Sequence, residues 1–188
     1  MSAIIPSDPG SVAWVITATA LVMLMTPALG FFYGGLVRKK NLVSTIAQCF
    51  IIFAVISIVW ALWGYMLVFG KSTNTGGLIG FSPSLLGMNG LDINAINTSL
   101  APKIPELLYF AFQLKFAAIT PALIVGACAE RIRFRSLLIF IVLWSTLIYG
   151  PIACWVWNPN GWLHNLGGPN VGAIDFAGGI VVHISSGI

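Results

Sequence analysis

The sequence is poor in charge. Five acidic and nine basic residues occur among 188, so charged residues make up 7% of the chain, against about 25% in soluble globular domains. Apolar residues account for 58%, and the mean hydropathy is +0.95. So little charge cannot solvate the surface of a water-soluble core. The composition therefore excludes a soluble domain and indicates a protein embedded in a lipid bilayer.

Cysteine is also scarce. The three cysteines, Cys49, Cys128 and Cys154, cannot make a closed disulfide framework. Cys49 and Cys128 fall near the predicted inner face of the membrane, and Cys154 falls near the outer one. We interpret all three as packing residues.

The basic residues are not spread over a polar surface. They form two clusters, Arg38 to Lys40 and Arg131 to Arg135, and both stand at the ends of long apolar runs. This distribution is typical of the flanks of membrane helices, whereas a nucleic-acid-binding protein shows a basic stripe on a polar face. We therefore expect no nucleic-acid partner, although the pI is about 9.2.

Long apolar runs divide the chain into predicted membrane spans. A helix needs about 20 apolar residues to cross about 30 Å of hydrocarbon. Residues 12–37, 42–69, 106–129 and 136–156 reach this length, and a fifth run covers 175–188. The fifth run is about two-thirds of a span. The sequence thus predicts an all-α polytopic membrane protein, of which this chain is expected to be the N-terminal part.

The basic clusters also predict the orientation of these spans. Short basic turns at 38–40 and 131–135 are expected on the cytoplasmic side. The N-terminus then lies outside, together with the 70–105 and 157–174 loops. Spans one, three and five run inward, and spans two and four run outward.

One ionisable residue falls inside a predicted span. His183 lies eight residues after Asp175, which places it about 12 Å further along a helix and near the middle of the bilayer. An ionisable group at that depth is a functional hypothesis. The alternative is a histidine buried between helices and hydrogen-bonded to a hydroxyl such as that of Ser186.

Asp175 has two compatible interpretations. As the N-cap of the fifth helix it would accept hydrogen bonds from free backbone N–H groups and complement the helix dipole. As a functional acid it would draw cations toward the outer mouth of a pore. Gly178 and Gly179, which follow it, are interpreted as positions of close helix packing.

Aromatic residues offer a second hypothesis. Phe112 and Phe116 stand at i and i+4 on one face of the third span, and Trp157 lies at the outer end of the fourth. Such residues commonly pack or face lipid, but cation–π attraction of about 0.5–2 kcal/mol could recruit a small cation. Lys115 lies about 100° from Phe116 around the helix, which predicts snorkelling or an inter-subunit contact. A Lys115 that reached the vestibule would instead repel cations.

A catalytic alternative rests on Asp175, His183 and Ser186, which are triad residue types. All three fall on one predicted helix, so they cannot form a relay without residues from elsewhere. An intramembrane enzyme is therefore a remote alternative.

Four segments, in this order, resemble the ammonium transporter (Amt/Rh) family. They read GFFYGGLVRKKN at 30–41, FQLKFAAITPALIVGACAERIRF at 112–134, PIACWVW at 151–157 and DFAGGIVVH at 175–183. The resemblance implies eleven helices built as two inverted five-helix repeats plus one, assembled as a homotrimer with a pore in each subunit. This chain resembles the first repeat.

The resemblance also implies roles for individual residues. Trp157 resembles a wall of the outer cation-recruitment site, and Phe116, with Phe112 beside it, resembles the outer phenylalanine gate. Asp175 resembles the acid that supports recruitment, and His183 the first of two pore histidines. Ammonium or methylammonium would be recruited and deprotonated, and neutral ammonia would cross a hydrophobic pore. No cofactor or metal is implied.

The resemblance leaves the class of activity open. The same fold can serve as the ammonium-sensing membrane domain of a signalling protein with a fused kinase, and the residues of this chain do not separate that alternative from transport. A transporter would be expected to bind a PII-type regulatory protein. An Rh-like gas channel is a weaker variant, since the motif around Trp157 is more similar to that of Amt proteins.

Overall fold

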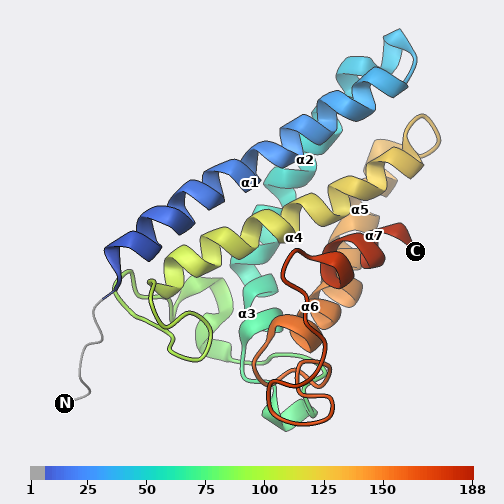
Figure 1. The fold of residues 1–188 in the computed structure, drawn as a ribbon. Helices are drawn as coiled ribbons and strands as arrows, with labels where there is room; N and C mark the ends of the chain where they lie inside the picture. Colours follow the sequence, from blue (N-terminus) through green and yellow to red (C-terminus); the bar gives the residue numbers. More distant parts are fainter. Residues whose placement is uncertain (1–6) are drawn as a thin grey trace.

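The computed structural model describes residues 7–188, whose regular elements are all helices (Figure 1). The first two long helices are α1 and α2, and α2 continues through a π-helical turn into α3: Pro9–Leu36, Leu42–Val59, Trp60–Gly64 and Tyr65–Phe69. Next come α4 and α5, and α5 continues through a second π-helical turn into α6: Glu106–Cys128, Phe134–Trp144, Ser145–Tyr149 and Gly150–Trp157. The chain ends with a π-helical segment and α7, Gly179–Ile184 and Ser185–Gly187.

Three short 3-10 turns lie between these helices, at Lys39–Asn41, Thr73–Thr75 and Pro83–Met88. When the turns within them are included, four helices are long and apolar enough to cross a membrane: Pro9–Leu36, Lys39–Phe69, Glu106–Cys128 and Phe134–Trp157. Each differs from its predicted span by three residues or fewer at either end. The predicted all-α membrane fold is therefore confirmed.

The two short turns of the chain lie at one end of the long helices, and the two long loops lie at the other. In Figure 1 the turns are those between α1 and α2 and between α4 and α5, and the loops are those after α3 and α6. The two basic clusters therefore share one end, as the proposed orientation requires. Which end faces the cytoplasm remains a prediction.

Polar contacts join the turns at the basic end. Glu130 Oε1 accepts hydrogen bonds from Asn41 Nδ2 at 2.6 Å and from the backbone N–H of Arg38 at 3.0 Å, and Arg38 Nε lies 3.1 Å from both carboxylate oxygens. These bonds hold the pKa of the Glu130 carboxyl below its usual value, those from Asn41 and Arg38 being the main causes. The turn after α4 is thereby attached to the turn after α1.

The opposite end is joined in the same way. Buried Asn158 follows α6, and its amide donates to the carbonyl oxygens of Val68 at 2.7 Å and Gly70 at 2.9 Å, which end α3. Because these carbonyls have no partner further along the helix, a side-chain donor is the natural substitute. The loop after α6 therefore starts from a fixed point.

Close approach of α1 and α4 depends on glycine. A Cβ built on Gly126 would lie 2.6 Å from Cε1 of Tyr33, whose hydroxyl donates to the Leu123 carbonyl at 2.9 Å. Only a residue without a side chain admits the ring there. Deeper in the molecule, α3, α4 and the two π-helical turns share one aromatic cluster, made of Trp60, Tyr65, Phe69, Phe110 and Tyr149.

The fifth helix differs from the prediction. It begins at Gly179, not at residue 175, because the backbone of residues 173–178 is irregular and Gly178 occupies the N-cap position. The predicted separation of about 12 Å between Asp175 and His183 assumed one continuous helix between them. That prediction is therefore wrong. The N-terminal part of the predicted helix is instead a loop, and its residues line a cavity together with residues of the first half of α4.

Candidate functional site

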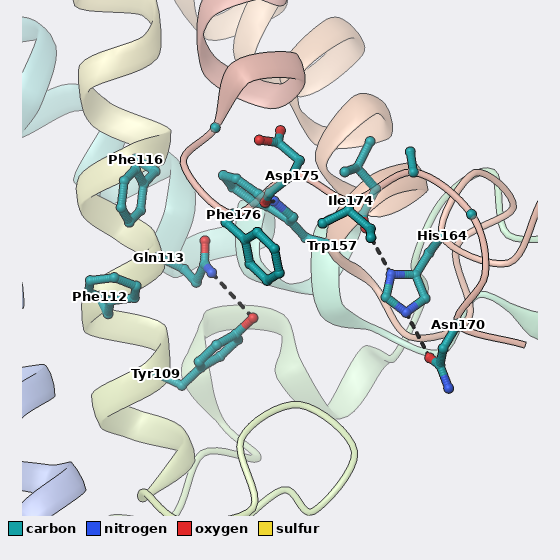
Figure 2. A pocket seen from close by; sticks show the side chains of 14 residues that line it. Tyr109, Phe112, Gln113, Phe116, Trp157, His164, Asn170, Ile174, Asp175 and Phe176 are labelled. Carbon is teal, nitrogen blue, oxygen red and sulfur yellow. Dashed lines mark hydrogen bonds between the residues drawn. The ribbon is translucent and has the colours of Figure 1, made fainter.

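A cavity of about 350 Å³ opens among the first half of α4, the end of α6 and the loop that leads to Gly178 (Figure 2). All four residues predicted to recruit a cation line this cavity: Phe112, Phe116, Trp157 and Asp175. We call this cavity the vestibule. His183 does not line it.

Three aromatic rings line this space in succession. The rings of Phe112 and Phe116 meet edge to face with centroids 5.0 Å apart, and those of Phe116 and Trp157 do so at 6.0 Å. The i and i+4 spacing on α4 places the first pair together, and α6 brings the indole to them from the other side. The π faces of such rings attract cations.

Trp157 is fixed by the loop beside it. Its indole Nε1 donates to the backbone carbonyl oxygen of Asp175 at 2.9 Å. Because an indole N–H is a donor only, this bond satisfies the polar edge of the side chain and leaves its apolar surface available to the vestibule.

The carboxylate of Asp175 holds the start of the next helix. Oδ1 accepts from the Gly179 N–H at 2.7 Å, and Oδ2 accepts from those of Ile180 and Val181, each at 3.0 Å. Asp175 therefore satisfies free donors of the helix, as predicted. It does so from three positions before the actual N-cap, Gly178, whereas the sequence predicted Asp175 itself as the N-cap. A negative charge at this end also complements the helix dipole.

Gly178 makes this reach possible. Its φ is +76°, in the left-handed region, and a Cβ built on it would lie 2.7 Å from Cγ2 of Val182. The glycine therefore turns the chain sharply, so that the Asp175 side chain faces the N–H groups that follow. The predicted role of close packing is a smaller part of what this residue does.

His183 lines a second cavity of about 360 Å³, which is almost wholly apolar. Its other lining residues come from α1, α4, the loop before Gly178 and the final helix: Met25, Ala28, Leu29, Phe32, Phe116, Ile119, Leu123, Ala177 and Val182. Phe116 lines both cavities. The vestibule and the cavity that the imidazole lines therefore share one phenylalanine.

The Ser186 hydroxyl, which the sequence offered as a hydrogen-bond partner for the His183 imidazole, does not bind it, so that prediction is wrong. The Ser186 hydroxyl donates to the backbone carbonyl of Val182 at 2.7 Å, not to the imidazole. Since the Asp175 carboxylate is bonded to backbone N–H groups, no side-chain hydrogen bond joins Asp175, His183 and Ser186 within residues 7–188. The geometry gives the triad alternative no support.

Tyr109, Gln113 and His164 are among the vestibule residues that the sequence did not single out. The ring nitrogens of His164 lie 3.1 Å from the Val156 carbonyl oxygen and 2.9 Å from Asn170 Oδ1. His164 falls in an irregular loop, where no periodicity marks it. Gln113 carried a signal, since a polar residue inside a span marks a candidate site.

Lys115 points away from the vestibule. Its Nζ lies 5.2 Å from the centroid of the Phe53 ring on α2, and the side chain does not line the cavity. The structure therefore favours a packing role for this cation over one that repels substrate. Among residues 7–188, no three His, Cys, Asp or Glu residues are grouped so that they could hold a metal ion.

Comparison with known proteins identifies the family. The family described as "Ammonium Transporter Family" matches residues 13–188. Ammonium transporter 1 of Schizosaccharomyces pombe is 44% identical over 179 residues, which are 95% of this chain and 34% of that protein. A putative ammonium transporter of Methanothermobacter thermautotrophicus is 46% identical over 186 residues, 96% of this chain and 42% of that protein.

Solved structures agree with these matches. The crystal structure of Saccharomyces cerevisiae Mep2 has a TM-score of 0.82 at 38% identity, covering 96% of this chain and 38% of that one. A structure described as "Sensor Amt Protein" has a TM-score of 0.76 at 31% identity, covering 92% and 40%. This chain spans 34–42% of the length of these relatives. By sequence and by fold, the chain belongs to the ammonium transporter family.

Proposed function

We propose that this chain forms the outer vestibule and the first part of the pore of a protein that transports ammonium across a membrane as ammonia. One observation carries the proposal: the aromatic vestibule and the apolar cavity of His183 are neighbours that share Phe116 as a lining residue. A cation-attracting site thus lies next to a compartment suited to a neutral molecule.

Physical chemistry assigns a step to each compartment. Ammonium would be attracted to the rings of Phe112, Phe116 and Trp157, where cation–π interaction offsets part of its lost hydration. An ion in the apolar cavity beyond would lose far more hydration than aromatic faces replace. Transfer of the proton to the imidazole of His183, which lines a cavity together with Phe116, would remove that cost, and ammonia would then pass on.

His183 is proposed to guide ammonia and to take part in moving the proton. In its uncharged form an imidazole has one donor and one acceptor nitrogen, so it can bind ammonia through either. Asp175 is proposed to act on recruitment by holding the backbone to which Trp157 is bonded and from which the His183 helix starts. No covalent substrate or cofactor is needed.

Replacement of His183 tests this function. In the full-length protein, reconstituted into liposomes, His183→Ala should abolish saturable methylammonium uptake, because the cavity would lose its only ring nitrogens among the residues that line it. The variant should elute from size-exclusion chromatography like the parent protein. Undiminished uptake by a correctly folded variant would refute the role of His183.

Ammonium sensing is a second candidate, favoured by the similarity to the sensor Amt protein. The vestibule would then bind ammonium and report its presence instead of passing it on. Saturable ammonium binding by the full-length protein, without uptake into liposomes, would favour sensing over transport.

We also propose that the full-length protein is a homotrimer. If it is a transporter, we propose that it binds a PII-type regulatory protein. Only 11% of the most apolar part of α1 is buried within this chain, so most of that helix is available to lipid, to other parts of the protein or to neighbouring subunits. The mass of the full-length protein, corrected for detergent by light scattering, tests the trimer.

A further inference from the structure

The vestibule contains a buried hydrogen-bond acceptor for which residues 7–188 provide no donor. Gln113 lies on α4 between Phe112 and Phe116, and only 7% of it is exposed. Its Nε2 donates to the Tyr109 hydroxyl at 3.2 Å, whereas Oε1 has no hydrogen-bond partner. A buried carbonyl oxygen without a donor is costly and therefore uncommon in folded proteins.

The direction of this oxygen relates it to the aromatic rings. Figure 2 shows the Gln113 amide with its nitrogen toward Tyr109 and its oxygen toward the space between Phe116 and Trp157. In the reverse orientation Oε1 would accept from the Tyr109 O–H, and the amide nitrogen would direct its N–H donors into that space. The orientation in the structure instead presents an oxygen acceptor there.

Other polar side chains of the vestibule already have partners. The carboxylate of Asp175 accepts three backbone N–H groups, and the indole N–H of Trp157 is bonded to a carbonyl. Both ring nitrogens of His164 lie beside oxygen atoms. Among the vestibule side chains, Gln113 Oε1 is the buried acceptor for which no donor is found within residues 7–188.

We propose that Gln113 is a positioning residue for the cation, whose N–H groups donate to its Oε1 while the aromatic rings attract its charge. This inference rests on the proposed function. Ammonium carries four N–H donors and methylammonium three, and π faces alone give these donors no oxygen acceptor. A hydrogen bond from a cation to the amide oxygen satisfies both groups and fixes the ion beside Phe116.

The proposal predicts a change in affinity more than in maximal rate. Gln113→Met keeps the length of the side chain but removes the acceptor. In the full-length protein in liposomes, the methylammonium concentration that gives half-maximal uptake should rise about tenfold or more. The maximal rate should change less than threefold, because the variant leaves Phe116 and His183 in place.

Two further variants separate this role from a structural one. Gln48→Met makes the same change on α2, outside the vestibule, and should leave half-saturation within twofold of the parent protein. Gln113→Asn keeps an amide but withdraws the oxygen by one methylene, and should also raise half-saturation if the methionine variant does not fold.

The outcomes separate the two proposals. If the parent protein and Gln48→Met take up methylammonium while a folded Gln113→Met or Gln113→Asn has unchanged half-saturation, the role of Gln113 is overturned and transport stands. If the parent protein shows no saturable uptake, the proposed transport function fails, and the inference fails with it. A selective rise in half-saturation for the Gln113 variants supports both.

Discussion

At the residue scale, Asp175 links the two cavities. Its backbone carbonyl holds the indole of Trp157 in the vestibule, and its carboxylate holds the helix that carries His183. The carboxylate therefore has a structural task whether or not its charge also attracts cations.

This task predicts a loss of stability on truncation. Asp175→Ala should lower the free energy of unfolding by about 1–2 kcal/mol, because the helix loses the acceptor of its first N–H groups. SDS-induced unfolding of the full-length protein measures the change. Asp92→Ala is the matched control, since exposed Asp92 accepts only the N–H of Asn94, and it should change stability by less than about 0.5 kcal/mol. Equal effects of the two variants would argue against the capping role.

At the element scale, the two π-helical turns face each other across the core. The indole N–H of Trp63, in the first turn, donates to the Thr146 hydroxyl in the second at 3.1 Å. The rings of Trp60 and Tyr149, one from each turn, have centroids 6.5 Å apart. Pro151 follows the second turn and has no N–H to give, which breaks the regular ladder there.

The contact between these turns predicts a modest cost on mutation. Thr146→Val keeps the shape of the side chain but leaves the Trp63 N–H without its acceptor, so the free energy of unfolding should fall by about 1 kcal/mol. Thr17→Val is the control, since the hydroxyl of Thr17 bonds only its own helix, at the Ala13 carbonyl. The same SDS titration measures both, and no difference between them would show that the bond contributes nothing.

The joined turns at the basic end predict a dependence on pH. The pKa of the Glu130 carboxyl is lowered by its bonds from Asn41 and Arg38, so the folded state favours the charged form. This contribution to stability is complete above the pKa of the unfolded state and is lost as pH falls through the lower pKa of the folded state. Thermal unfolding midpoints between about pH 3 and 7 should fall less steeply toward acid in Glu130→Gln than in the parent protein. Parallel curves would contradict this prediction.

At the scale of the whole molecule, the orientation in the membrane can be measured. Single cysteines at Ser84, in the loop after α3, and at Ser136, near the start of α5, are exposed at opposite ends. In a full-length background without native cysteines, an impermeant thiol reagent should label position 84 from outside and position 136 only after the membrane is opened. Labelling of position 136 from outside would reverse the topology.

The sequence predicted the spans closely because their signal is additive over many residues. The bounds of α1 and α4 depend on total hydropathy and on breakers, which local composition records. The start of the last helix was wrong for a local reason: Asp175 is a good capping residue, but the cap position is set by the left-handed turn at Gly178. Periodicity contains no such information.

The site was only partly predictable for the same reason. The i and i+4 pair Phe112 and Phe116 follows from helix geometry alone, whereas its contact with Trp157 depends on how α4 and α6 pack. The free oxygen of Gln113 is a property of what surrounds the residue, so only the structure could reveal it.

The shared wall made by Phe116 has a kinetic consequence. Because one ring lines both cavities, rotation of that side chain would change the shape of both without a rigid-body displacement of helices. Side-chain rotation takes picoseconds to nanoseconds at open sites, against microseconds to milliseconds for domain motions. Under the proposed function, a gate formed by this ring would have the time scale of a channel and not that of an alternating-access carrier.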